Sequence, residues 1–542
     1  MLIDLIQRHG LAMWDAWCGV YTLVTLWIVW RVMKVLGIYR KRPVRIDALF
    51  PLLNAYMGGT SVLLGKWLSS LEFMVDGAGM ICDIYRRLGS GKSFAIPALG
   101  EYQVLVSSEQ QIRELDRSSE DVLSFHAAME QRIKHKYTLC GFEHNDVDPN
   151  NDVPKRVLKV RLRMNLPEIQ GNLQPLIRDT VSQELTKGSG GWSRVSGLTL
   201  AKHLITRVNN RVILGSDLGK NDIIAAIQLC TDDSIASDPR FEDDVNRYLQ
   251  DAVVTMELCR HLPSILVPLV APVMMHWSGA MHRINCSITA DIEKRVAENQ
   301  NAPVIAPRRY DCIQWVMESS KTEAQRSVAR LTQQMFGILF ASAHQMTMAL
   351  VYAMFDLCLH PEYIEPLRKE IKRVRRTTNF SDHFDHLPLL DSFLRESARL
   401  NALDALTMQR MALSPYTFAD GTHVPAGNLV AVPQAAVMQD SRHYAEPTEF
   451  NAYRFVAVDE TDGTMRAFPK YTDVRWDYPY WGSSKRACPG RWYVSRTLKQ
   501  ILAHLVMNYD IKLANEDAPR SFVWTTAVVP RSSTKLMLRP RK

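Results

Sequence analysis

Two long stretches of the chain carry almost no charge, and the first lies near the N-terminus. Residues 11–30 read LAMWDAWCGVYTLVTLWIVW and contain a single charged side chain, Asp15. About 20 apolar residues suffice for a helix to span a bilayer, and tryptophans of the kind found at both ends suit the two interfaces. The pattern predicts a transmembrane signal anchor at 11–30. A short amphipathic or buried helix is the alternative.

Basic residues follow this stretch. Lys34, Arg40, Lys41, Arg42 and Arg45 lie within the next 15 residues. Lys and Arg gather on the cytosolic side of membrane spans, and no small-residue cleavage site precedes them. We therefore expect a lumenal segment at 1–10, the uncleaved single-pass anchor at 11–30, a basic linker at 31–60 and a cytosolic domain at 61–542.

The second uncharged stretch runs from Leu331 to Phe355. Its length would also span a membrane, but Gln333, Gln334, His344 and Gln345 interrupt it. Polar side chains are costly in hydrocarbon. The stretch therefore predicts a long helix buried in a soluble domain, with polar residues midway that indicate the wall of a pocket.

The rest of the chain is dominated by helix-like periodicity. Strand-like segments lie between residues 381 and 460, and Asp420-Gly421 is typical of a tight hairpin turn. No repeat, Gly/Ser linker or sharp change in composition divides the part after the anchor. These patterns predict one large, mainly α domain with small β-sheets.

Composition narrows the class of protein. The 542 residues are 46% hydrophobic and 23% charged, which excludes an intrinsically disordered chain. The net charge of +8 suits an acidic partner or a membrane surface but is too small to indicate nucleic-acid binding. Nine scattered cysteines without a C-x-x-C pair argue against a disulfide framework or a zinc ribbon, and favour a reducing compartment.

Several common catalytic motifs are missing. The segment LGSGKSF at 88–94 resembles a phosphate-binding loop, but the first glycine of that motif is replaced by Arg86. We expect a turn before a strand there. Neither H-E-x-x-H nor G-x-S-x-G occurs, so zinc-protease and serine-hydrolase chemistry have no support.

The informative segment runs from Trp481 to Arg491, WGSSKRACPGR, and precedes an apolar helix. A cysteine at a helix N-terminus receives backbone N–H groups and the positive end of the helix dipole, which favours the thiolate. A thiolate is a strong iron ligand. Gly490 lacks a Cβ, so the chain can pass close to a flat macrocycle.

This segment resembles the cysteine loop of the cytochrome P-450 family, Phe-x-x-Gly-x-Arg-x-Cys-x-Gly. Trp481 stands where the family usually has Phe, and Ser484 where it usually has Gly. The resemblance implies that Cys488 is the axial ligand of haem b (iron protoporphyrin IX), that Arg486 pairs with a propionate, and that Trp481 packs over the sulfur. A positive-φ turn at Ser484 would be strained. A buried structural cysteine is the alternative.

A Glu-x-x-Arg helix is the family's second motif. The i,i+3 spacing places carboxylate and guanidinium on one helix face. Three such pairs occur, but only Glu396/Arg399 directly precedes the strand-rich stretch; Glu365/Arg368 and Glu370/Arg373 are interpreted as a solvated face. The later segment FNAYRF resembles the family's arginine motif, so Arg454 is expected to complete a structural triad with Glu396 and Arg399.

The buried helix carries the expected oxygen site. Residues 341–346, ASAHQM, resemble the family's Ala/Gly-Gly-x-Asp/Glu-Thr-Thr segment, with His344 at the acid position and Gln345 in place of the threonine. The resemblance implies that both are catalytic. An amide donates hydrogen bonds but cannot relay a proton as a hydroxyl does. Satisfied polar residues at a helix crossing remain the alternative.

Further positions complete the resemblance. Arg410 and Lys159 match cations near the propionates or the reductase-docking face, although a basic helix is often simply solvated. Residues 206–215 and 418–427 resemble filamentous-fungal members that oxidise terpenoid and indole-terpenoid secondary metabolites. Candidate pocket residues by position are Phe340, Ala341, His344, Ala405, Leu406 and Thr526.

The resemblance implies a haem-thiolate monooxygenase on the endoplasmic reticulum membrane. Electrons would come from NADPH through NADPH-cytochrome reductase, and oxygen from O2 would enter a lipophilic substrate, with a terpenoid as the expected class. Gln345 leaves a second hypothesis open, a haem-thiolate enzyme that catalyses rearrangement, dehydration or desaturation. A third is a non-catalytic haem-binding membrane protein.

Overall fold

The computed structural model describes residues 60–98, 101–143, 147, 152–185, 191–215, 239–262, 264–301, 309–377, 383–458 and 465–541. The chain divides into two compact units, Met1–Leu68 and Ser69–Lys542, and the second contains all the sites considered below. The predicted anchor at 11–30 and its flanking segments up to residue 59 lie outside the described residues.

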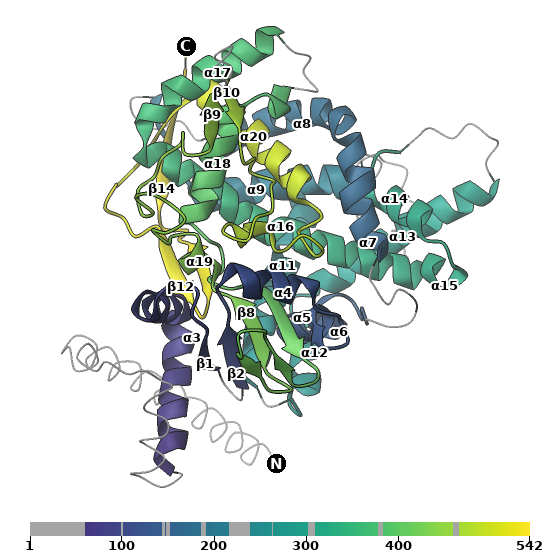
Figure 1. The fold of residues 1–542 in the computed structure, drawn as a ribbon. Helices are drawn as coiled ribbons and strands as arrows, with labels where there is room; N and C mark the ends of the chain where they lie inside the picture. Colours follow the sequence, from purple (N-terminus) through teal and green to yellow (C-terminus); the bar gives the residue numbers. More distant parts are fainter. Residues whose placement is uncertain are drawn as a thin grey trace, which may run out of the picture. The chain divides into compact units, whose positions relative to one another are not determined.

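Helices predominate in the described part of the chain (Figure 1). The helices are α3 (Thr60–Leu88), α4 (Glu109–Arg117), α5 (Phe125–Ile133), α6 (His135–Thr138), α7 (Asp152–Arg156), α8 (Arg163–Glu184), α9 (Gly197–Asn209), α11 (Pro239–His261), α12 (Val267–His276), α13 (Ala280–Asn301), α14 (Cys312–Ser319), α15 (Glu323–Arg326), α16 (Val328–Leu359), α17 (Ile364–Thr377), α18 (Pro388–Leu400), α19 (Gln434–Val437) and α20 (Arg491–Asn508). Short 3₁₀ and π-helical turns include η1 (Val157–Leu162), η3 (Asn210–Leu214), η5 (Pro361–Tyr363), η6 (His383–Asp385) and η7 (Pro479–Trp481).

The strands form small sheets. They are β1 (Phe94–Ala98), β2 (Glu101–Leu105), β3 (Leu123–Ser124), β4 (Ser193–Ser196), β5 (Thr407–Ala412), β6 (Tyr416–Thr417), β7 (His423–Val424), β8 (Leu429–Val432), β9 (Val456–Val458), β10 (Met465–Ala467), β11 (Tyr509–Leu513), β12 (Ser521–Trp524), β13 (Ala527–Pro530) and β14 (Lys535–Pro540). The largest sheet has the order β1-β2-β8-β5-β3, in which β2 and β8 are parallel and the other neighbours antiparallel. The prediction of a mainly α fold with small sheets is confirmed.

Two sequence predictions about turns are also confirmed. The segment at 88–94 is a turn that leads into β1, and Gly89 and Gly91 take positive φ angles there. Asp420 and Gly421 connect β6 to β7, with Gly421 at φ 88°. Both turns need the left-handed backbone that glycine adopts without a steric penalty.

The long uncharged stretch forms α16, a helix of 32 residues. By length and composition alone α16 could cross a membrane, but 67% of its most apolar window is buried inside the fold. Figure 1 shows α16 in the middle of the helical part, and it contacts α9, α13, α18 and β11. The prediction of a buried core helix is confirmed, because α16 packs against other parts of the protein.

The interpretation of α17 as a solvated face is wrong for Arg368 and Glu370, whereas Glu365 and Arg373 are exposed. Arg368 is 8% exposed and donates to the carbonyl oxygens of Val506 and Tyr509 at 2.9 and 3.1 Å. Glu370 is 4% exposed and accepts the backbone N–H groups of Leu389 and Leu390 at 2.7 and 3.1 Å. Because the first N–H groups of a helix have no partner within it, Glu370 caps α18 from a neighbouring helix.

This cap predicts a pH-dependent contribution to stability. Burial raises the pKa of Glu370 to about 7, although the two N–H groups oppose the shift. The folded state therefore favours the neutral carboxyl, and its contribution to stability is complete at low pH and is lost as pH rises from about 4.5 to about 7. We expect the melting temperature of wild type minus that of Glu370→Gln to fall over this interval. A difference that rises with pH, or stays constant, would contradict the burial assignment.

Candidate functional site

The loop from Pro479 to Gly490 folds tightly around a cysteine. The backbone N–H of Cys488 donates to the carbonyl oxygen of Trp481 at 2.8 Å, which closes the loop. Gly482 has φ 82°, and a Cβ there would lie 3.3 Å from the carbonyl oxygen of Arg486. The positive φ of the loop falls on Gly482 and not on Ser484, so the strain that a positive-φ turn would cause at Ser484 does not arise. Ser484 Oγ instead donates to the Asp116 carboxylate.

The cysteine lies at the start of a helix, as the sequence indicates. Gly490 is the residue before α20, and a Cβ on it would meet no atom within 4 Å. Burial raises the pKa of Cys488, while the N–H groups of Gly490 and Arg491 and the Arg491 charge act in the opposite direction. Burial outweighs the helix N-terminus, so the protein alone does not favour the thiolate. A bound metal ion would have to displace the proton.

Cys488 borders a cavity of about 370 Å³ between this loop and α16. The α16 residues that face the cavity are Ala341, Ser342, Gln345, Met346 and Ala349. These residues are three, four, seven or eight positions apart, which places them on one face of the helix. The cavity therefore lies between a sulfur atom and the unusual polar segment of the core helix.

The structure separates the two residues predicted to be catalytic. Gln345 faces the cavity, whereas His344 does not line it, because it lies about 130° around the helix from the centre of the lining face. Burial, with Lys202 of α9 nearby, lowers the pKa of His344. The prediction that His344 faces the reacting group is therefore corrected to a position on the side of α16 near α9. Phe340 packs against the core and is likewise off the cavity face.

The remaining pocket candidates also divide. Leu406 lines the cavity, as does Ala341. Ala405 and Thr526 do not line it, but they are buried directly behind its wall, where the N–H of Ala405 donates to the carbonyl oxygen of Thr526 at 2.7 Å. Both therefore hold the wall rather than form its surface.

Two predicted cations reach the cavity. Arg410 on β5 is 1% exposed, its NH1 group donates to the carbonyl oxygen of Gln409, and its Nε has no partner in the described part of the chain. Arg486 lines the same cavity and pairs with Glu120 at 2.5 Å. Burial, together with the Arg486 charge, lowers the pKa of Arg410 to about 10. The Glu120 and Asp116 charges act in the opposite direction. The unpartnered Nε leaves hydrogen-bonding capacity on a buried cation, which a bound anion would satisfy.

Lys159 does not belong to this group. Lys159 is exposed on the π-helical turn η1 and is not part of the cavity lining. Its assignment as a cofactor-binding residue is therefore wrong. A lysine head group prefers water, and η1 presents it there.

Trp481 takes part in the wall through its ring. The indole is 8% exposed, and its Nε1 donates to the carbonyl oxygen of Tyr471 at 2.6 Å. Tyr480 meets it edge-on at 4.9 Å between ring centroids. This hydrogen bond fixes the ring next to the loop. The phenylalanine that is usual at this position of the cysteine-loop motif has no ring N–H and could not form it.

Glu396 lies between the two arginines grouped with it in the sequence. Its carboxylate is 2.8 Å from Arg399 and 2.9 Å from Arg454. Glu396 and Arg399 are completely buried, and Arg399 also donates to the carbonyl oxygens of Met438 and Pro447. The three side chains connect α18 to the segment that contains Arg454, just before β9. The cysteine loop comes later in the chain.

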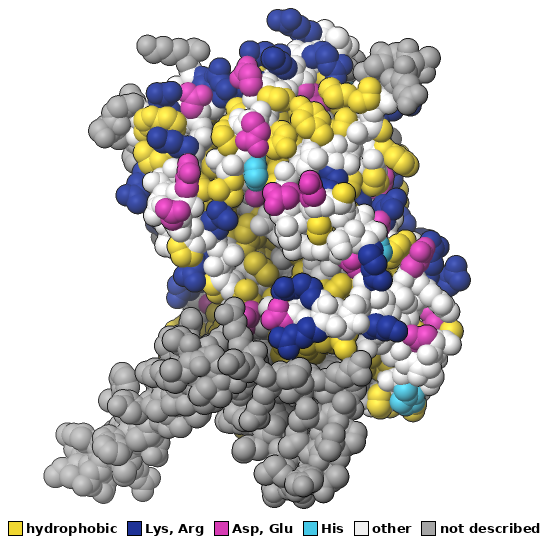
Figure 2. Space-filling model, turned by 60° about the vertical axis from the view of Figure 1, so that its left-hand side comes forward, with side chains coloured by type: hydrophobic (Ala, Val, Ile, Leu, Met, Phe, Trp, Pro, Cys, Tyr) yellow, Lys and Arg dark blue, Asp and Glu magenta, His cyan; other side chains and the backbone are white. Residues whose placement is uncertain are grey.

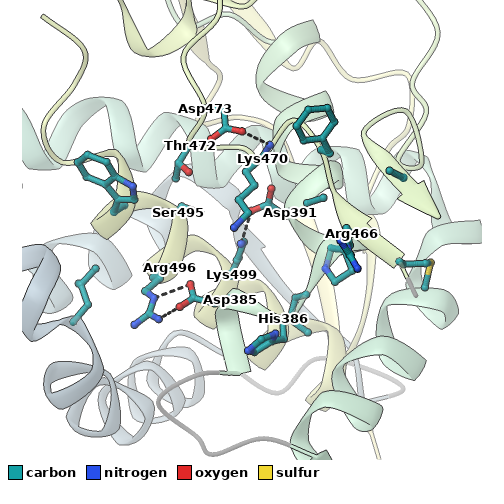
Figure 3. A pocket seen from close by; sticks show the side chains of 18 of the residues that line it. Asp385, His386, Asp391, Arg466, Lys470, Thr472, Asp473, Ser495, Arg496 and Lys499 are labelled. Carbon is teal, nitrogen blue, oxygen red and sulfur yellow. Dashed lines mark hydrogen bonds and ion pairs between the residues drawn. The ribbon is translucent and has the colours of Figure 1, made fainter. Parts of the chain in front are cut away.

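A larger cavity of about 1080 Å³ lies elsewhere, and it does not contain the sulfur. Figure 3 shows that acidic and basic side chains in its wall face one another in pairs. Asp385 pairs with Arg496, Asp391 with Lys499, and the N–H of Lys470 donates to Asp473. Because these charges are already paired, they offer less chemistry than the smaller cavity.

Four residues of the site have no sequence motif. Asp116 and Glu120 hold the cysteine loop from more than 360 residues away. Arg132 on α5 pairs with Asp404, and both line the cavity. Such partners are brought together by the fold, so local spacing contains no signal for them.

Comparisons with known proteins agree with this arrangement. The family model described as Cytochrome P-450 matches residues 168–538. The chain is 26% identical to cytochrome P-450 monooxygenase 151 of Postia placenta, with 89% of this chain and 93% of the relative covered. It is 27% identical to cytochrome P-450 monooxygenase olcJ of Penicillium canescens, with 88% and 86% covered.

Two further similarities extend the picture. The chain is 26% identical to an ent-kaurene oxidase of Gibberella intermedia over 98% of this chain and 94% of the relative. Among solved structures, the retinoic acid-bound cyanobacterial CYP120A1 aligns with a TM-score of 0.64 at 18% identity, over 87% of this chain and 96% of that one. The structural alignment shows the fold that surrounds the cysteine loop and α16.

Proposed function

The chain belongs to the cytochrome P-450 family of haem-iron oxidoreductases, and from this premise we propose that it inserts oxygen from O2 into a lipophilic, terpenoid-type secondary metabolite. The observation that carries the proposal is the cavity that Cys488 and Gln345 border from opposite elements. An ent-kaurene oxidase among the relatives supports the terpenoid class.

The residues around the cavity fit a haem, and we propose haem b. Cys488 would supply the sulfur ligand, and the open space at Gly490 suits a flat macrocycle close to the backbone. Arg410, which has an unpartnered Nε, and Arg486 would receive the propionates. When bound, the haem supplies the activation of dioxygen, with the thiolate favouring cleavage of its O–O bond.

Gln345 lines the cavity from α16. Its amide can donate a hydrogen bond from Nε2 and position water, but it has no proton that it can pass on. Replacement of Gln345 with threonine supplies a hydroxyl. For an oxygenase, we expect the product formed per NADPH consumed to rise at least about twofold, because proton delivery limits coupling. The measurement is the ratio of product to NADPH, and a fall in that ratio would count against the role.

The same residue supports a second candidate function. An enzyme that rearranges or dehydrates its substrate at the haem has no need of a proton relay to dioxygen, and Gln345 lacks one. Turnover without NADPH and without oxygen would identify this function. Product that contains ¹⁸O from ¹⁸O2 would exclude it.

We propose that NADPH-cytochrome reductase supplies the electrons and docks beside the N-terminal part of α20. Arg163 of α8 and Arg491 both lie over the Trp492 ring, at 4.1 and 3.6 Å from its centroid. Arg163 is exposed at the rim of the larger cavity and offers a positive charge to an acidic partner. These side chains adjoin the helix that starts three residues after Cys488.

Reversal of this charge tests the docking surface. In Arg163→Glu we expect reductase-supported turnover to fall about tenfold at low salt, while chemical reduction by dithionite is unchanged. Arg113→Glu, an exposed arginine on α4, is the control. Equal losses in both variants would contradict the proposed surface.

We propose that the catalytic unit is held at the endoplasmic reticulum membrane by the anchor at 11–30, with the catalytic domain in the cytosol. The support is the sequence pattern, since these residues lie outside the described part.

On the face shown in Figure 2, Lys/Arg and Asp/Glu side chains are interspersed, so the net charge of +8 does not produce a single basic surface there.

The experiment for the whole proposal uses the full chain with reductase, NADPH and ¹⁸O2 against a panel of terpenoids. We expect at least one product that is 18 mass units heavier than its substrate, because one ¹⁸O atom from ¹⁸O2 has been inserted. Consumption of NADPH without labelled product from any terpenoid would contradict the substrate class.

A further inference from the structure

A further polar group lines the cavity, apart from Gln345, Arg410 and Arg486. It consists of Arg132 on α5, Asp404 after α18 and Gln434 on α19. Asp404 joins the other two: its carboxylate pairs with Arg132, and its backbone carbonyl oxygen accepts from Gln434 Nε2 at 2.7 Å. Three distant segments therefore place these polar side chains at one point of the wall.

The pair of charges at this point is neutral as a whole. Although burial alone would raise the pKa of Asp404, the Arg132 guanidinium and the hydrogen bond from the N–H of Leu406 hold it below its ordinary value. Glu257 of α11 adds a second carboxylate near Arg132. A buried ion pair is expensive to desolvate, and a well-packed apolar pair is often as stable. Stability therefore does not explain why the chain has these charges at a cavity.

The group has hydrogen-bonding capacity that the described residues do not use. Arg132 has five N–H donors, its side chain is 26% exposed, and Asp404 is its sole hydrogen-bond partner in the described part of the chain. Gln434 is 6% exposed, and its Oε1 has no partner there. The bond from Nε2 to Asp404 fixes which end of the amide is the acceptor.

We propose that Arg132 and Gln434 recognise a hydroxyl group on the substrate. An N–H of Arg132 would donate to the hydroxyl oxygen, and the hydroxyl would donate to Gln434 Oε1. The inference deepens the proposed function and rests on it, because it names the chemical class of the lipophilic substrate as an alcohol.

Charge and hydrogen bonding argue against hydrocarbons and carboxylic acids as the substrate. A hydrocarbon would cover Arg132 and Gln434 and leave their polar groups without partners, and a site of this kind rejects an analogue that lacks the hydroxyl. A carboxylate would add a negative charge beside Asp404 and Glu257 and could not donate to Gln434 Oε1. The substrate consequently comes from a reaction that introduces or keeps a hydroxyl group.

The test is a binding titration on the ferric holoenzyme. The spin-state change of the haem is the signal that reports binding. The ligands are triplets of one carbon skeleton, each a hydrocarbon, its monohydroxy derivative and its carboxylic acid, from a sesquiterpene, a diterpene and a triterpene. We expect at least one alcohol to bind about tenfold more tightly than the other two members of its triplet. No preference for the alcohol in any triplet would overturn the proposal. Neither reductase nor turnover is needed, so a failure of the oxygenase proposal is distinguishable.

Two variants connect the preference to these residues. Arg132→Lys keeps the charge opposite Asp404 but removes the forked N–H donors, and Gln434→Met removes the acceptor at similar volume. We expect either change to reduce the preference below about threefold, while Arg113→Lys on α4 leaves it unchanged. Haem content is measured in each variant. Loss of haem from Arg132→Lys, or an unchanged preference in both variants, would overturn the proposal.

Discussion

Replacement of Glu396 with glutamine is expected to destabilise the domain by about 3–5 kcal/mol. The carboxylate lies between Arg399 and Arg454, and it also accepts the N–H of Asn451 at 3.1 Å. Glutamine preserves the size of the side chain but removes the charge. Two guanidinium groups would then remain in a buried region without an anion. Thermal unfolding monitored by far-UV circular dichroism measures the change, together with the haem content of the purified protein.

The chain provides a matched control for this variant. Glu365 and Arg368 on α17 have the same spacing, and their side chains are 3.1 Å apart. Glu365 is 58% exposed, so water replaces the lost contact in Glu365→Gln, and we expect a loss of at most about 1 kcal/mol. Similar losses in the two variants would show that burial of the triad is not the source of its stability.

Replacement of Cys488 with alanine is expected to reduce NADPH-dependent product formation at least a hundredfold, which corresponds to more than about 2.7 kcal/mol. The variant keeps the hydrogen bond from residue 488 to Trp481, since that bond uses the backbone. The loop can therefore fold without the sulfur. Product formation is measured with the full chain, reductase and the best terpenoid of the panel.

The control for this loss is Cys82→Ala on α3. Burial raises the pKa of Cys82 to about 11, so this thiol is protonated and packs as a small apolar group. We expect its turnover to remain within about twofold of wild type. Retention of wild-type turnover by Cys488→Ala would remove the sulfur from the mechanism.

The sequence was sufficient where chemistry lies in a short segment. Cys488, Gly490 and the start of α20 are contiguous, and the i,i+3 spacing of Glu396 and Arg399 is a local property of one helix. The same holds for α16, since the absence of charge over its length and the glutamines within it both distinguish a buried helix from a membrane span.

Spacing was not sufficient where burial decides the role of a residue. The pairs Glu365/Arg368 and Glu370/Arg373 have the same pattern as Glu396/Arg399, yet Glu370 caps α18 and Arg368 reaches β11. His344 and Gln345 are adjacent in sequence, but the helical rotation between them places only Gln345 in the cavity. Arg132 and Asp404 are 272 residues apart, and their contact depends on the whole fold.

The central claim is that the Cys488 sulfur binds the haem iron. The difference spectrum of the reduced protein with carbon monoxide tests it directly, because a thiolate ligand moves the Soret band to a characteristic long wavelength. We predict this band in wild type and in Cys82→Ala, and its loss in Cys488→Ala. A wild-type band at the position given by a histidine ligand, or an unchanged band in Cys488→Ala, would contradict the account.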